Sequence, residues 1–247
     1  MSDVEFKSVN VNGHILLNDD LTLKPSLVNL FEFLQVKDVT TMEQANEYCQ
    51  KHLLRPKGIE RQQQEPHPLE DQFDKALPIL RSMYMIDAIP ASGSYRYLVF
   101  NGQSLPQMRK QVEYIKYKIH VHFDEIVFAT GNRQFQAIFD ADDPLFGKLT
   151  SEYNAASFFV KKYFPGIKAT VLNATTTELP RPNTKTTIEA WLRNNPEPGS
   201  ILMVSNNPYI GYQYLTWYGS LKEHGWFDNG GSLSMCGDYQ RENPRNR

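Results

Sequence analysis

The sequence predicts an α/β protein built on a doubly wound, mainly parallel sheet. Four short apolar, β-prone runs recur at similar spacing, at 97–101, 125–130, 168–173 and 200–205, and a helix-like stretch follows each run. The segments YLVF, IVFA and ILMV are almost uninterrupted apolar residues, which is typical of parallel strands that are buried on both faces. Right-handed crossovers between such strands give a doubly wound sheet.

Composition bounds the class of protein. The 247 residues suffice for one large domain, or for a domain with an extension, and 40% apolar and 12% aromatic residues are typical of a globular core. A net charge of −2 without a basic stripe argues against nucleic acid as a partner. The apolar runs are shorter than the roughly 20 residues that cross a bilayer, and no signal peptide is visible, so no membrane partner is expected. Cys49 and Cys236 have neither metal spacing nor a disulfide framework, which favours a reducing cytoplasm.

Residues 1–95 are predicted to form a helical extension that packs on the core domain, 96–247. Ser26 is expected to cap a first helix, and Thr41 with Gln44 resembles a capping box that opens a second helix reaching about His52. The proline-rich stretch 55–71 is predicted to be a surface loop, and a third helix is expected after it. These helices offer a surface for a protein partner. The expected apolar positions of the first and third helices are Leu27, Leu30, Phe31, Leu34, Phe73, Leu77 and Leu80.

In the second part of the chain, helices are predicted at 105–119, 151–163, 183–193 and 210–222. The first has apolar residues at three- and four-residue steps, which is the pattern of an amphipathic helix. A long loop is expected over 131–149, and no element is assigned after Gly225. The expected inward positions are Leu105, Met108, Val112, Ile115, Ile119, Ala155, Phe158, Phe159, Tyr163, Ile188, Trp191 and Leu192.

Polar residues and glycines gather where the strands end. Gly102 and Gly131 follow the first two strands, and Glu152 and the pair Asn183–Thr184 open the next two helices. In a parallel sheet these places fall on one edge, where open α/β sheets bind their ligands. Glycine lets the backbone approach a ligand closely. Each residue also has a purely structural explanation: a carboxylate is favoured in the first turn of a helix, and asparagine is a good N-cap.

Five segments, in order, resemble a known family. They are LVFNGQS, IVFATGN, LTSEYNAASFFVKKYFPGI, ELPRPNT and ILMVSNNP, which together span roughly 97–218. This set is similar to the bacterial α/β family of unknown function that includes YdcF, SanA and ElyC. The resemblance implies a Rossmann-like fold with a pocket at the strand ends, of the soluble YdcF-like type, because the membrane anchor of SanA and ElyC has no counterpart here. Since YdcF is associated with S-adenosylmethionine, the resemblance makes that compound the first candidate ligand and cofactor.

The residues expected to bind the ligand are Gly102, Gln103, Gly131, Asn132, Arg133, Asn183, Thr184 and Asn206. Arg133 is the cation expected at the pocket mouth, where it could hold a carboxylate or a phosphate. Glu152 is the expected acid–base group, or a ligand for ribose hydroxyls. Glu178 is expected only to steady the turn before Asn183.

Two departures from the family pattern bear on the chemistry. Thr186 and Thr187 stand where relatives commonly have Glu-Asn. The segment Asn206–Asn207–Pro208–Tyr209 stands where many have His and Arg. A neutral, hydrogen-bonding pocket built from these groups would suit a nucleoside better than a triphosphate.

Other constellations are weaker. His120, His122 and Asp124 could hold zinc but precede the second strand, away from the expected pocket. The loop aspartates Asp140, Asp142 and Asp143 could hold magnesium, although no phosphate-binding Gly-Lys-Ser/Thr loop accompanies them. Ser104 and Ser205 lack the Gly-x-Ser-x-Gly setting of a hydrolase nucleophile. No metal is therefore expected.

The leading hypothesis is a protein that binds a nucleoside-type small molecule at the carboxyl ends of the strands, with transfer chemistry if it is an enzyme. Two alternatives stay open. One is a catalytically degenerate interaction module that uses its N-terminal helices, and the other is a metal-dependent phosphoester hydrolase. Fold resemblance alone does not decide among them.

Overall fold

A computed structural model of the chain describes residues 18, 22–53, 72–83, 85–207 and 209–238. The chain divides into two compact units, and the boundary between them lies between Ile86 and Asp87. The sequence predicts this boundary at 95–96, nine residues later. None of the helices in the described ranges is long and apolar enough to cross a membrane.

The N-terminal unit is helical. Its elements are α1 (Pro25–Phe33), α2 (Met42–Tyr48), the π-helical turn η1 (Cys49–Leu53) and α3 (Phe73–Ser82). The predicted capping box is confirmed, because Thr41 accepts from the Gln44 N–H and the Gln44 side chain accepts from the Thr41 N–H. The expected Ser26 cap is wrong: the N-cap is Lys24, because proline suits the first position of a helix and Pro25 takes it. The predicted loop 55–71 lies outside the described residues.

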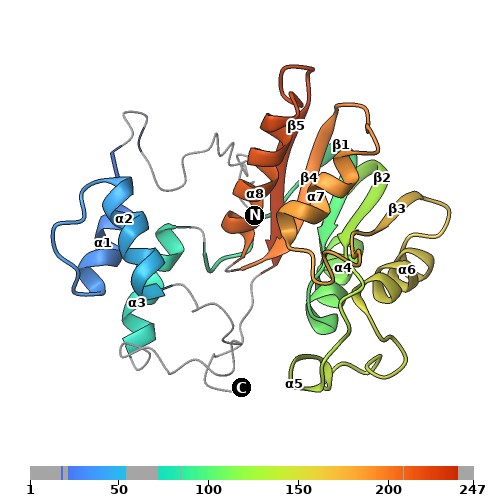
Figure 1. Ribbon diagram of the computed structural model, residues 1–247, viewed down its shortest axis with the longest axis horizontal. Helices are drawn as coiled ribbons and strands as arrows, with labels where there is room; N and C mark the ends of the chain where they lie inside the picture. Colours follow the sequence, from blue (N-terminus) through green and yellow to red (C-terminus); the bar gives the residue numbers. More distant parts are fainter. Residues whose placement is uncertain (1–17, 19–21, 54–71, 84, 208, 239–247) are drawn as a thin grey trace, which may run out of the picture. The chain divides into compact units, whose positions relative to one another are not determined.

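The second unit contains a five-stranded, all-parallel sheet, as Figure 1 shows. Its strands are β1 (Gly93–Asn101), β2 (Val121–Thr130), β3 (Lys168–Asn173), β4 (Ser200–Asn206) and β5 (Ser232–Asp238), in the order β3-β2-β1-β4-β5. Every strand pair is parallel. The predicted Rossmann-like α/β fold is confirmed.

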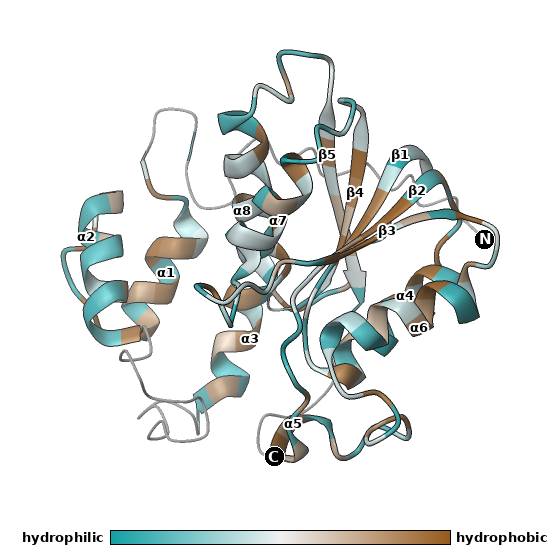
Figure 2. Ribbon diagram, turned by 45° about the vertical axis from the view of Figure 1, so that its right-hand side comes forward, coloured by the Kyte–Doolittle hydropathy of each residue, from teal (hydrophilic) through white to brown (hydrophobic). Residues whose placement is uncertain are grey.

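Helices cover both faces of the sheet. They are α4 (Leu105–Lys118), the short α5 (Ala137–Asp140), α6 (Glu152–Tyr163), α7 (Thr184–Leu192) and α8 (Ile210–Glu223). In Figures 1 and 2, α4 and α6 lie on one side of the sheet, and α7 and α8 lie on the other. The contacts agree, since α6 packs on β2 and β3 from one side and α7 packs on the same two strands from the other.

The strand side chains alternate between two buried layers. Leu98 and Phe100 belong to the cluster that includes the apolar faces of α4 and α6. Tyr97, which precedes Leu98 and points to the opposite face, has its ring centroid 5.2 Å from that of Trp191 of α7. Because both faces are covered, the centre of the sheet is apolar throughout, as the brown strands in Figure 2 show.

The fifth strand was not predicted. Its sequence, SLSMCGD, has the serines and the glycine of a loop, yet Leu233, Met235 and Cys236 are buried against the core.

The order of the strands indicates where an open α/β sheet would bind a ligand. The chain runs from β1 outward to β3 on one side and then returns to β4 and β5 on the other, so the order reverses between β1 and β4. In open α/β sheets the crevice outside the carboxyl ends at such a point is the ligand site.

Candidate functional site at the carboxyl edge

A buried ion pair joins the ends of β1 and β2 to the start of α6. Arg133 Nε lies 2.6 Å from Glu152 Oε1, and the two side chains are only 21% and 9% exposed. The pair is held by the backbone as well, because the Glu152 N–H donates to the Arg133 carbonyl. A methyl group added at Gly102 would lie 2.4 Å from Glu152 Oε2, so the carboxylate rests directly against the end of β1. Gly102, Arg133 and Glu152 therefore converge, as predicted.

The Glu152 carboxyl group has a perturbed pKa. Burial raises it above its ordinary value, while Arg133 and a hydrogen bond from the Gly131 backbone oppose that shift. Glu152 follows Ser151, whose hydroxyl accepts from the Asn154 N–H as the cap of α6. A raised pKa in a carboxyl group next to a glycine-lined strand end is a recognised mark of functional sites. The hydrogen bond from Arg133 Nε fixes the position of this carboxylate.

The second strand end is packed against the loop before α7. A methyl group at Gly131 would lie 2.4 Å from Pro182 Cγ, and the Asn132 N–H donates to Thr175 Oγ1 at 2.7 Å. Asn183, next to Pro182, accepts from the Thr186 N–H at 3.0 Å, and Thr186 Oγ1 accepts from the Asn183 N–H. The side chain of Asn183 thus completes a capping box. The expected N-cap role is confirmed, and this loop stands beside the end of β2.

At the ends of β1 and β4, one set of polar groups is fully used within the fold. Asn101 Nδ2 and Ser205 Oγ both donate to Gln213 Oε1 of α8, at 3.0 and 2.6 Å. Trp217 Nε1 donates to Asn101 Oδ1 at 3.0 Å. This network ties the two strand ends together on the α8 side. It also gives Ser205 a structural partner rather than the setting of a nucleophile.

A second set of amides, on the α4 side, is only partly satisfied. Gln111 Nε2 donates to Asn206 Oδ1 at 2.6 Å, and Asn207 Nδ2 donates to the Asp87 carbonyl. Among the described residues, five buried side-chain atoms have no partner, and four of them belong to this strand edge and to the helix beside it. Those four are Gln103 Nε2, Gln111 Oε1, Asn206 Nδ2 and Asn207 Oδ1. Buried polar groups are normally paired, so this concentration needs an explanation.

Two of the three loop aspartates form hydrogen bonds or ion pairs within the fold. Asp140 is fully buried and accepts from the Leu105 N–H at 2.6 Å and the Gln136 N–H at 2.8 Å, which satisfies the start of α4. Asp143 pairs with Arg109 Nε at 2.8 Å, and Asp142 is exposed. Within the described ranges, no three His, Cys, Asp or Glu side chains are grouped as metal ligands would be.

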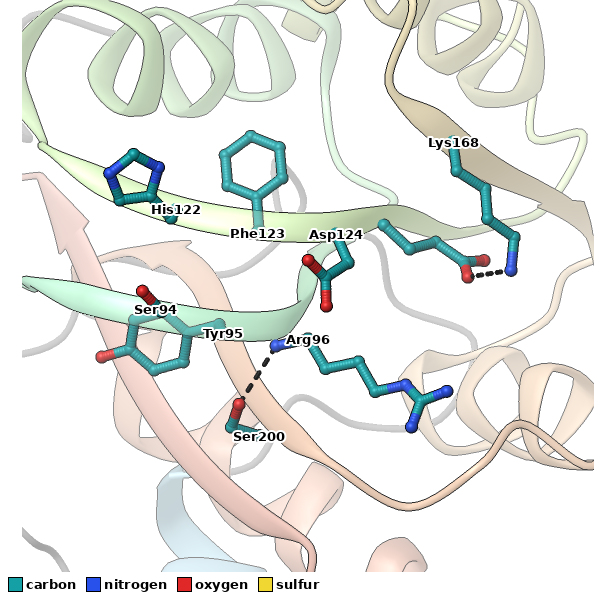
Figure 3. A pocket seen from close by; sticks show the side chains of 9 residues that line it. Ser94, Tyr95, Arg96, His122, Phe123, Asp124, Lys168 and Ser200 are labelled. Atoms are coloured by element: carbon teal, nitrogen blue, oxygen red, sulfur yellow. Dashed lines mark hydrogen bonds and ion pairs between the residues drawn. The ribbon is translucent and has the colours of Figure 1, made fainter.

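A pocket of about 440 Å³ lies at the opposite, amino edge of the sheet (Figure 3). It exists because β1 and β2 pair from Gly93 and Val121 onward, whereas their outer neighbours join only from Tyr97 and Glu125. His122 and Asp124 lie there, away from the predicted site, as the sequence suggests. Glu125 in this pocket is buried, but both of its oxygens already have partners, Lys168 Nζ at 2.7 Å and Thr170 Oγ1 at 2.6 Å, whereas unpartnered buried amide atoms lie at the carboxyl edge.

Comparisons with protein-family models, with curated proteins and with solved structures give no match. The resemblance to the YdcF-like family therefore stays a prediction. The structure brings together Gly102, Gly131, Arg133 and Glu152. Asn132 is held by Thr175, and Pro182 places the start of α7, with Asn183 and Thr184, beside the end of β2. Gln103 and Asn206 lie at the ends of β1 and β4. Gln111 is not among the predicted site residues. The one sign of it in the sequence is a glutamine on the apolar face of an amphipathic helix.

Proposed function

We propose that this protein binds a nucleoside-type small molecule at the carboxyl ends of β1, β2 and β4, with S-adenosylmethionine as the first compound to test. The observation that carries the proposal is the cluster of unpartnered buried amide atoms beside the reversal of strand order. A side-chain amide carries an NH2 donor group and a carbonyl acceptor, and such groups read the edge of a nucleobase.

The Arg133–Glu152 pair supports the same assignment. Glu152 Oε2 packs against Gly102 and Oε1 accepts from Arg133 Nε, so the carboxylate is held in place at the end of β1 as an acceptor for a ribose hydroxyl or an amino group. Because Arg133 already neutralises Glu152, the pair presents little net charge. This balance favours a ligand of low charge over a nucleoside triphosphate.

If the protein is an enzyme, transfer chemistry with Glu152 as the acid–base group is the reaction we propose. Burial raises the pKa of Glu152, which is what a carboxyl group needs to exchange a proton nearer neutral pH. Replacing Arg133 would remove an opposing influence and raise that pKa further.

Thermal melting with a panel of nucleosides and nucleotides tests the proposal. A compound present at 100 times its dissociation constant stabilises the fold by about 2.7 kcal/mol. We expect S-adenosylmethionine or adenosine to raise the melting temperature, and Glu152→Ala to abolish the response. Asp228→Ala, an exposed carboxylate outside the predicted site, is the matched control and should respond like the wild type.

An absence of any response across the panel would discard the proposal and favour the interaction-module alternative. A response that Glu152→Ala leaves intact would show that the ligand binds elsewhere, with the amino-edge pocket as the first place to look.

A further inference from the structure

The amides at the end of β4 differ from their neighbours in one respect. Alternation along the strand directs Ser205 toward α8, where its hydrogen bond to Gln213 completes a closed network. It directs Asn206 toward α4, where Gln111 is its partner. Gln111, Asn206 and Asn207 are at most 3% exposed, yet each keeps one polar atom without a partner. An unmade hydrogen bond in a buried site is costly, so these atoms are poor choices for stability alone.

The hydrogen bonds of these amides show which of their donors and acceptors have no partner. Asn207 must donate through Nδ2, because its partner is a backbone carbonyl, and this leaves Oδ1 as a free acceptor. In the Gln111–Asn206 pair one amide donates to the other, so either assignment of oxygen and nitrogen leaves one donor and one acceptor unused. The three side chains together therefore offer one donor and two acceptors.

A short segment, Asp87–Ile89, closes this end of the sheet. Asp87 supplies the carbonyl that Asn207 contacts, and Ile89 pairs with Gly237 of β5 through two backbone hydrogen bonds of 2.9 and 3.0 Å. The Tyr114 hydroxyl, one turn beyond Gln111 on α4, donates to the Ile89 carbonyl at 3.4 Å. The amides are thus bracketed by α4, by the end of β4 and by this strap.

We propose that Gln111, Asn206 and Asn207 form a subsite for the uncharged edge of a nucleobase that both donates and accepts hydrogen bonds, as the amino-pyrimidine edge of adenine does. The strap Asp87–Ile89 must open to admit it. The inference rests on the proposed function and specifies which part of the ligand these residues read. A charged group is disfavoured, because neutral amides cannot repay its loss of hydration.

The first test compares two ligands on the unmodified protein. Adenosine carries the exocyclic amino group, whereas purine riboside lacks it and is otherwise the same. Loss of one buried hydrogen bond weakens binding by about tenfold, so we expect the dissociation constant of purine riboside to exceed that of adenosine by about that factor. Equal dissociation constants would overturn the subsite and leave the proposed function standing. Failure of every nucleoside to bind would overturn both.

The second test uses the double variant Gln111→Met/Asn206→Leu, which replaces the amides by apolar groups of similar size. Removing both partners together avoids leaving one of them unpaired, so we expect the variant to melt at or above the wild type without ligand. We also expect the variant to lose the upward shift of about 5 °C that the proposal predicts for the wild type with excess adenosine. A double variant that keeps the full adenosine response overturns the inference. Asp228→Ala is again the control, and it should keep the full adenosine response.

Discussion

Gly102→Ala is the substitution whose effect follows most directly from the geometry of the site. The added Cβ would lie 2.4 Å from Glu152 Oε2 and 2.9 Å from Glu152 Cδ. The carboxylate would have to move about 1 Å away from the added Cβ to restore an ordinary van der Waals distance. The carboxylate is not free to make that movement, because Arg133 Nε holds its other oxygen at 2.6 Å in a side-chain environment that is 9% exposed.

The expected loss of stability combines two costs. Overpacking of a well-packed site costs about 1–3 kcal/mol, and disruption of a buried ion pair costs up to about 3–5 kcal/mol when it is complete. Because the pair is displaced rather than removed, we expect the free energy of unfolding to fall by about 2–4 kcal/mol. Urea denaturation followed by circular dichroism measures this value.

A double-mutant cycle separates the proposed cause from any other. In the Glu152→Ala background the clash disappears, so Gly102→Ala should cost less than about 1 kcal/mol there. Gly219→Ala is the matched control: position 219 lies within α8 with open space around it, and alanine should stabilise that helix by about 0.5–1 kcal/mol. A neutral Gly102→Ala, or additive effects in the cycle, would refute the contact between β1 and Glu152.

Two further predictions concern the same edge. Because burial raises the pKa of Glu152, its contribution to stability is present below the ordinary value of 4.5 and is lost as pH rises through the folded-state value. The wild type should therefore lose stability relative to Glu152→Gln as the pH rises from 4 to 8. The same comparison in an Arg133→Met background should show a steeper loss, and a difference that does not change with pH would contradict the prediction. Asn183→Ala should cost about 1 kcal/mol through loss of the α7 cap, whereas Asn183→Asp should keep the cap and hence the stability in urea denaturation. An equal loss in both variants would mean that the amide has a role beyond capping.

Much of the fold could be predicted because local patterns and burial agree. The four apolar runs became β1 to β4, and the inward residues expected for α7, Ile188, Trp191 and Leu192, are buried. The amino-terminal halves of β1 and β2 were missed because they extend past their neighbours and carry exposed polar residues such as Ser94 and His122. β5 was missed because an edge strand needs fewer apolar residues than a central one.

The site was predictable only where sequence position fixes spatial position. Gly102 and Glu152 follow from the rule that parallel strand ends meet at one edge. The pairing of Gln111 with Asn206, and of Asp140 with the start of α4, joins residues far apart in the chain. Such contacts depend on packing between particular helices and strands, which no local pattern encodes. Asp140, a candidate magnesium ligand in the sequence, instead accepts the Leu105 N–H at the start of α4.

The claim that the carboxyl edge is the ligand site can be tested most directly by hydrogen exchange with and without adenosine. We expect slower exchange in peptides containing Gly102, Gly131 and Asn206, and no change in peptides containing Ser94 and His122 from the opposite edge. Protection confined to the Ser94 and His122 peptides would contradict the account and assign binding to the amino-edge pocket.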